Sequence, residues 1–176
     1  MPFLIIGGIV LIIVLWAVST VNGFKRKEIK IQESLSGIEV ALTKRYDLLT
    51  KLLDTAKGYM KHEKEVYTEV IRLRKGMDIG ELNEAEKQVS RFSGSLFAVA
   101  ENYPELTSSQ VFQELQRGIF DAEEHLQAAR RLYNANVSAY NTAIVMFPGS
   151  LLAGGRTSKE LFEAEAHKRE DVKMQF

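Results

Sequence analysis

The sequence predicts an all-α protein, a long antiparallel bundle of three to four helices with coiled-coil-like packing, joined to an N-terminal transmembrane helix. Residues 3–21 carry no charge, and apolar residues recur every three or four positions through most of the chain that follows. Prolines stand only at positions 2, 104 and 148. A proline inside a helix removes a backbone hydrogen bond, and the 3.5-residue spacing is typical of long packed helices.

The uncharged stretch is long enough to cross a membrane, because about twenty apolar residues in a helix span a hydrocarbon core of roughly 30 Å. A secretory signal peptide is the alternative, since Ala17-Val18-Ser19 resembles a small-residue cleavage site. However, no Lys or Arg precedes the stretch, whereas signal peptides usually begin with positive charges. We therefore expect an uncleaved anchor over residues 1–23, with the lipid bilayer as a partner through residues 3–21.

Four basic residues follow the anchor within ten positions. Lys and Arg close to a membrane span tend to stay in the cytoplasm. We therefore expect a single-pass protein of the cell (inner) membrane, with its N-terminus outside and its bundle in the cytoplasm. The same charges also favour anionic lipid, at about 1 kcal/mol each, so both explanations of them stay open. These juxtamembrane residues are Lys25, Arg26, Lys27 and Lys30.

The bundle is expected over residues 24–153, and it contains three long helices. Their approximate bounds are 24–76, 81–103 and 108–147. Residues 154–176 are expected to form a short helix, near 158–168, and a tail. At 1.5 Å per residue the part of the first helix from 31 to 76 is about 70 Å long and the second helix only about 35 Å. Part of the apolar side of the first helix would then stay uncovered.

Short motifs mark the expected helix ends. Gly76 is a suitable residue to follow the first helix, because glycine adopts the left-handed conformation found there. Asp78 with Glu81, and Thr107 with Gln110, match the capping box, in which two side chains bond to free backbone N–H groups at a helix start.

Polar residues interrupt the apolar seam of the bundle at Arg45, Glu63 and Asn136. A buried charge needs a partner, since breaking a buried ion pair costs about 3–5 kcal/mol. The third helix offers such partners, which are Glu123 and Glu124 for Arg45, and Arg130 and Arg131 for Glu63. These residues either fix the register of the helices or form a buried binding site, and we favour the first explanation.

The sequence shows no pattern of a catalytic or nucleic-acid-binding protein. It has no cysteine, and none of its three histidines has the spacing of a zinc-binding HExxH or a di-iron Glu-x-x-His motif. Basic and acidic residues both number 23, whereas nucleic-acid binders usually show an uncompensated basic face. We therefore expect a protein that is not an enzyme, with no cofactor, no metal and no nucleic-acid partner.

Several segments together resemble the LemA family. Residues 38–49 (IEVALTKRYDLL) and 58–63 (GYMKHE) resemble the signature of its first helix, and residues 100–106 (AENYPEL) resemble a turn of the family. Further similarity runs through the third helix, through Phe147-Pro148 and the residues after it, and to the terminal Phe176. The resemblance implies a helical bundle on a single-pass membrane anchor. It brings no catalytic residues to this chain.

Three functions from different classes remain. The leading one is a non-enzymatic, membrane-tethered scaffold or interaction protein that forms homo-oligomers and binds other membrane or cytoplasmic proteins. It follows from the apolar side of the first helix that the second helix leaves uncovered, since large exposed apolar patches are uncommon on monomers. The second is membrane remodelling or an envelope-stress response through lipid contact. The third and least favoured is a metal enzyme with its site in the bundle core.

Overall fold

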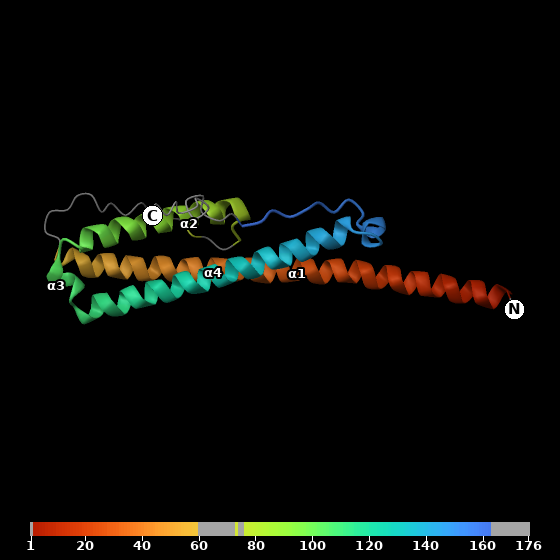
Figure 1. The fold of residues 1–176 in the computed structure, drawn as a ribbon, viewed down its shortest axis with the longest axis horizontal. Coiled ribbons are helices and arrows are strands. Elements are labelled where there is room, and N and C mark those ends of the chain that lie inside the picture. Colours follow the sequence, from red (N-terminus) through yellow and green to blue (C-terminus); the bar gives the residue numbers. More distant parts are fainter. Residues whose placement is uncertain (1, 60–72, 74–75, 163–176) are drawn as a thin grey trace, which may run out of the picture. The chain divides into compact units, whose positions relative to one another are not determined.

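The computed structural model describes residues 2–59, 73 and 76–162, and all of its regular elements are helices (Figure 1). The expectation of an all-α protein is confirmed, since no strand occurs in these residues. The elements are α1 (Pro2–Lys57), α2 (Ile79–Ala100), α3 (Pro104–Thr107), α4 (Gln110–Val145) and the 3-10 helix η1 (Gly149–Leu152).

The chain divides into two compact units, and both α1 and α4 contribute to each. The first unit comprises residues 1–37 and 129–161, and the second comprises residues 38–128 and 162–176. The first unit is therefore assembled from segments that lie far apart in the sequence.

In the first unit, α4 runs antiparallel to α1. The amide of Asn136 donates to the carbonyl oxygen of Lys30 at 3.2 Å, and one helical turn later on α4 the hydroxyl of Tyr140 lies 3.4 Å from Glu28 Oε1, nearer the start of α1. Large apolar side chains from both helices fill the space between them. The buried ones are Phe24, Ile31, Tyr133, Val137, Tyr140 and Ile144.

After α4 the chain turns back through η1 beside the start of the packed part of α1. The ring of Phe24 lies 3.4 Å from the position that a Cβ would take at Gly149. That Cβ would also collide with the carbonyl oxygen of Ala143, so the turn requires glycine at this position. The segment that follows continues along α4, where the side chain of Asn141 bonds to the backbone of Lys159 at 2.8 and 2.9 Å.

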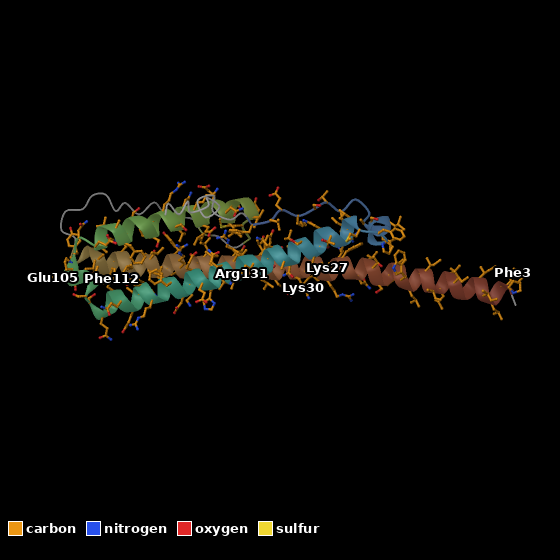
Figure 2. The ribbon with its side chains drawn as sticks, viewed as in Figure 1. Phe3, Lys27, Lys30, Glu105, Phe112 and Arg131 are labelled. Carbon is orange, nitrogen blue, oxygen red and sulfur yellow. The ribbon has the colours of Figure 1, made fainter. Side chains whose placement is uncertain are left out.

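The first part of α1 has none of the other described residues packed against it. Among the described residues, α1 is the one helix long and apolar enough to cross a membrane, and none of its most apolar 18-residue window is buried. Phe3, at the free end of the helix in Figure 2, is 86% exposed.

In the second unit, α2 runs parallel to α1 and α4 runs antiparallel to it (Figure 1). Glu39 accepts a hydrogen bond from the backbone N–H of Gly76, just before α2, and Arg45 donates to Ser90 farther along both helices. The predicted antiparallel order of successive long helices thus holds for α2 with α4, but it does not hold for α1 with α2. Buried apolar residues from all three helices form the core, among them Ile38, Leu42, Leu49, Leu52, Leu82, Val89, Leu96, Ile119, Ala122 and Leu126.

The bounds of two predicted helices need correction. The first helix ends at Lys57 and not near residue 76, because Gly58 and Tyr59 form a turn and Leu73 is not helical. Glycine is about 1 kcal/mol less favourable than alanine inside a helix, which makes Gly58 a weak point for continuing α1. Residues 60–72 lie outside the described part. As a result, the portion of α1 in the second unit is about as long as α2, and the predicted mismatch in length is not found between them.

The predicted C-terminal helix near 158–168 is not helical over residues 158–162, and the remainder lies outside the described residues. The side chains of Asn141 and Tyr133 hold this segment, because the Tyr133 hydroxyl donates to the carbonyl oxygen of Glu160 at 3.0 Å. Backbone groups that bond to side chains of α4 in this way are not available to a helix of their own.

The capping box at α2 is confirmed. Asp78 Oδ1 accepts from the N–H of Glu81 at 2.8 Å, and Glu81 Oε2 accepts from the N–H of Asp78 at 3.0 Å. The capping residue predicted for the next long helix is wrong. The hydroxyl of Thr107 bonds back to carbonyl oxygens because residues 104–107 form α3, and Ser109 instead accepts from the N–H of Phe112 at 3.2 Å.

Candidate functional site

Arg45 forms the polar centre of the second unit. Its side chain is only 9% exposed, its Nη1 lies 2.8 Å from Glu123 Oε2 on α4, and it donates to Ser90 Oγ on α2 at 3.1 Å. Of the two partners proposed from the sequence, the structure thus brings Glu123 to Arg45, whereas Glu124 is exposed. One guanidinium group therefore joins all three long helices of this unit.

The ion pair of Arg45 is close but imperfectly bonded. Arg45 Nε and Glu123 Oε2 are both buried, yet neither atom makes a hydrogen bond within the described part of the chain. The other carboxylate oxygen, Oε1, accepts from Gln127 Nε2 at 2.7 Å. Leaving buried polar atoms unsatisfied costs free energy, which offsets part of the stabilisation from the close contact between Arg45 Nη1 and Glu123 Oε2.

Asn136 has a similar position in the first unit. Its Nδ2 donates to the carbonyl oxygen of Lys30 and to Ser34 Oγ, at 3.2 and 3.3 Å, so both amide hydrogens are used between α4 and α1. Arg130 is buried and Arg131 is exposed. The proposed partner of these two arginines, Glu63, lies outside the described residues, and that pairing stays a prediction.

Sequence reasoning missed a cluster of charges around Glu28. One carboxylate oxygen of Glu28 lies 3.1 Å from Lys25 Nζ, and the other lies 3.3 Å from Arg156 Nε and 3.4 Å from the Tyr140 hydroxyl. The guanidinium of Arg156 also lies over the ring of Phe24, 5.1 Å from its centroid, a cation–π contact. The cluster thus joins α1, α4 and the segment after η1.

Gly154 and Gly155 direct Arg156 toward this cluster. Both have positive φ angles, +52° and +76°, which favour glycine because it has no Cβ. Two consecutive glycines in a sequence indicate only a turn. The structure shows that the turn delivers a side chain whose partner, Glu28, is 128 residues away in the sequence.

The cluster shifts the protonation of two of its members. The hydrogen bond from Lys25 holds the pKa of Glu28 below its ordinary value, burial opposes this, and the charges of Lys25 and Arg156 add to the lowering. Burial raises the pKa of Tyr140, and the nearby Glu28 carboxylate adds to the rise. Glu28 is therefore the anionic centre of this part of α1, and Tyr140 remains a neutral hydroxyl that donates to it.

The other three juxtamembrane cations lie on a different side of α1. Arg26, Lys27 and Lys30 line a surface pocket of about 330 Å³ between α1 and α4, together with Gly23, Asn136 and Ala139. Figure 2 shows Lys27 and Lys30 on the stretch of α1 that lies beside α4. The four basic residues expected to act together are thus divided into a paired lysine, Lys25, and a group of three at a pocket.

No metal centre is found in the part of the chain that the structure describes, since it contains no group of three or more His, Cys, Asp or Glu residues placed to hold an ion. The polar groups brought together are instead Arg45 with Glu123, Glu28 with Lys25 and Arg156, and the three cations of the pocket. These arrangements can hold helices together or bind an anion.

The chain is similar to one protein family and to several known proteins. The profile of the LemA family matches residues 34–176. Protein LemA of Metamycoplasma hominis is 26% identical over 158 residues, which cover 86% of this chain and 72% of that protein. Magnetosome protein MamQ of Magnetospirillum gryphiswaldense is 32% identical over 60 residues, or 34% of this chain and 22% of that protein. Magnetosome protein MamQ 2 of Paramagnetospirillum magneticum is 33% identical over 60 residues, with the same coverage.

A double-mutant cycle tests the pairing of Arg45. Arg45→Ala and Glu123→Ala each remove one partner, and we expect a coupling free energy of about 1–3 kcal/mol between them, as is typical of contacting residues. The measurement is chemical unfolding of the detergent-solubilised full-length protein. Glu124→Ala is the matched control, because Glu124 is exposed on the same helix and should show no coupling to Arg45. Equal coupling to Glu123 and Glu124 would contradict the pairing.

Glu28→Gln is expected to remove a pH-dependent part of the stability. Because the folded pKa of Glu28 lies below its ordinary value of 4.5, its stabilising effect is complete above pH 4.5 and is lost as the pH falls through the folded pKa. Partly exposed ion pairs contribute about 0.2–1 kcal/mol. Thermal unfolding from pH 7 to pH 3 should show a difference between wild type and variant that shrinks in acid.

The control for this experiment is Glu105→Gln, which removes one carboxylate from an exposed position in the second unit. It corrects for the change in net charge. A difference between wild type and Glu28→Gln that is the same at pH 7 and pH 3 would show that the carboxylate charge of Glu28 does not matter.

Proposed function

This chain belongs to the LemA family, and on that premise we propose that it is a non-enzymatic, membrane-tethered scaffold that binds itself and other proteins beside a bilayer. The observation that carries the proposal is the apolar start of α1, which has the length of a membrane span and which no other described segment covers. A membrane-spanning helix of this kind holds the rest of the chain beside the bilayer. The helices that follow then supply surfaces for binding.

An aromatic surface of the second unit supports the binding role. Phe120 on α4 is 58% exposed and stacks on Phe97 of α2, with ring centroids 6.1 Å apart and planes 21° apart. The buried ring of Phe112 supports Phe97 through an edge-on contact, with ring centroids 6.3 Å apart. Rigid, partly exposed aromatic side chains are enriched at protein interfaces. We assign this surface to self-association.

The end of α4 favours a second candidate function, which is membrane remodelling or an envelope-stress response through lipid contact. Val145, Met146, Phe147 and Leu151 are all more than half exposed, and Phe147 is 80% exposed. In the first unit the segment directly after α4 packs near Phe24, and Phe24 follows the apolar stretch by only three residues. Exposed apolar side chains at that depth can enter the interfacial layer of a bilayer.

Phe120→Gln is expected to weaken self-association about tenfold, since an interface aromatic commonly contributes 1–2 kcal/mol or more. Size-exclusion chromatography with light scattering on the full-length protein in detergent measures the shift from oligomer to monomer across a dilution series. Val111→Gln is the control. It is exposed on the same helix, and nine residues at 100° per residue place it on the opposite side of α4. A wild-type protein that stays monomeric at every concentration would remove the self-association proposal.

We also propose that the protein crosses the cell (inner) membrane once, with a short N-terminus outside and the bundle in the cytoplasm. The basic residues after the apolar stretch support this orientation. Because the chain has no cysteine, single-cysteine variants report on it directly. In intact cells, an impermeant thiol reagent should label Pro2→Cys and should not label Glu84→Cys, an exposed position on α2. Labelling in the reverse pattern would invert the orientation.

A further inference from the structure

We propose that Arg26, Lys27 and Lys30 form a binding site for a phosphate-bearing anion, which the bilayer presents as the headgroup of an anionic phospholipid. The site is the pocket of about 330 Å³ between α1 and α4 in the first unit. Its volume lies at the lower end of the range of ligand pockets, roughly 300–1,000 Å³. The inference rests on the proposed membrane anchor and adds a chemical specificity to it.

Helical spacing brings the three cations to one side of α1. Positions 23, 26, 27 and 30 are separated by three or four residues, so they are neighbours on the helix surface. Gly23 stands at the membrane-side corner of this group and carries no side chain. A Cβ built at Gly23 meets no atom within 4 Å, so the space beside the cations is open at this residue.

Helix α4 forms the opposite wall of the pocket without supplying further donors. Ala139 is small, and both amide hydrogens of Asn136 are already bonded to Lys30 and Ser34. The hydrogen-bond donors that face the pocket are therefore the ammonium and guanidinium groups of the three basic residues. Such groups bind phosphate oxygens through short, charge-assisted hydrogen bonds.

These three cations have no counter-charge among the described residues. No ion pair is found there for Arg26, Lys27 or Lys30, whereas their neighbour Lys25 is paired with Glu28 at 3.1 Å. Glu33, the next acidic residue on this side of α1, is exposed and lies within 4 Å of none of them. Three like charges at one pocket repel each other, and a bound anion relieves that repulsion.

The depth of the site favours a lipid over a soluble phosphate. At 1.5 Å per residue, Arg26 and Lys27 lie about 7.5 and 9 Å beyond Val21, the last residue of the apolar stretch. The headgroup layer on each side of a bilayer is roughly 5–8 Å thick. Side chains of a helix lean toward its N-terminus, which here is the membrane side, so Lys30 also reaches back toward this layer.

The experiment uses full-length protein, stripped of lipid in a neutral detergent and titrated with phosphatidylglycerol or phosphatidylcholine under native mass spectrometry. Wild type is expected to retain one phosphatidylglycerol in preference to phosphatidylcholine. Lys27→Gln and Lys30→Gln should each weaken this binding about fivefold, the equivalent of the contribution of one basic residue at a membrane surface. Gly23→Leu should weaken it as well, by filling the pocket without any change in charge.

Lys25→Gln is the matched control, because it removes one charge at the same depth from a residue outside the pocket. The proposed site would be overturned if Lys25→Gln and Lys27→Gln lost phosphatidylglycerol binding equally, or if Gly23→Leu left that binding unchanged. Either result would leave only a general attraction between the basic residues and anionic lipid. Circular dichroism of each variant confirms that the helices are intact. Continued membrane insertion and oligomerisation of the variants would show that the tether and scaffold stand independently of the site.

Inorganic phosphate distinguishes the two sources of the anion. If phosphatidylglycerol remains bound in millimolar phosphate, the lipid headgroup is the ligand. If phosphate displaces the lipid, and its own binding is lost in Lys27→Gln and Gly23→Leu, the pocket is an anion site that takes free phosphate, and its assignment to lipid is overturned. If neither phosphatidylglycerol nor phosphate binds to wild type, the whole proposal is wrong.

Discussion

Water is a poor solvent for the start of α1, and no other part of the described protein covers it. More than ten large apolar side chains between Phe3 and Val18 are exposed. Burying one such side chain is worth about 1.5–3 kcal/mol, so together they favour hydrocarbon by on the order of 20 kcal/mol. This exceeds the free energy of folding of a typical domain, roughly 5–15 kcal/mol. The free energy that favours α1 in a bilayer is thus larger than the free energy of folding of a typical domain.

Polar groups then determine how α1 and α4 align. Asn136 and Glu28 connect the two helices in the first unit, and Arg45 connects them through Glu123 in the second. A shift by one helical turn would separate these groups from their partners, and the loss is costly for the buried guanidinium of Arg45. Leucine and isoleucine at the surrounding seam positions fit several registers, whereas these few polar contacts fit one. The register role that the sequence suggested for Arg45 stays a prediction.

The 3.5-residue spacing predicted the buried side of the second unit well, because Ile38, Leu42, Leu49 and Leu52 are all buried as expected. It holds only in part in the second half of α4. The spacing predicts positions 129, 133, 136, 140, 143 and 147 there. Tyr133 and Tyr140 are buried as predicted, but Arg130, Val137 and Ile144 are buried in place of 129, 136 and 143, and Phe147 is exposed. A straight α-helix has 3.6 residues per turn, so a seam of 3.5 drifts by about 20° per heptad. The one-residue shift is the result of that drift.

Other features had no signal in the sequence. Periodicity shows which side of a helix is buried but not its direction, so the parallel α2 could not be predicted. Arg45 and Glu123 could be paired because a charge in an apolar seam demands a partner. Glu28 gave no such sign, since beside Lys25 it looks like one half of an ordinary surface pair. Its partner Arg156 is fixed by a distant glycine turn, which only the folded chain brings near.

The first unit combines segments that the ribosome synthesises at different times. Its ties between α1 and the later segments join residues 106 to 128 positions apart. At about 5–20 residues per second, the ribosome needs roughly 5 to 26 seconds to make the second partner after the first. During that interval the anchor is already available for insertion, while Phe24, Ile31 and the basic residues between them still lack α4. Nascent chains therefore present this part of α1 to the bilayer surface before the protein itself can cover it.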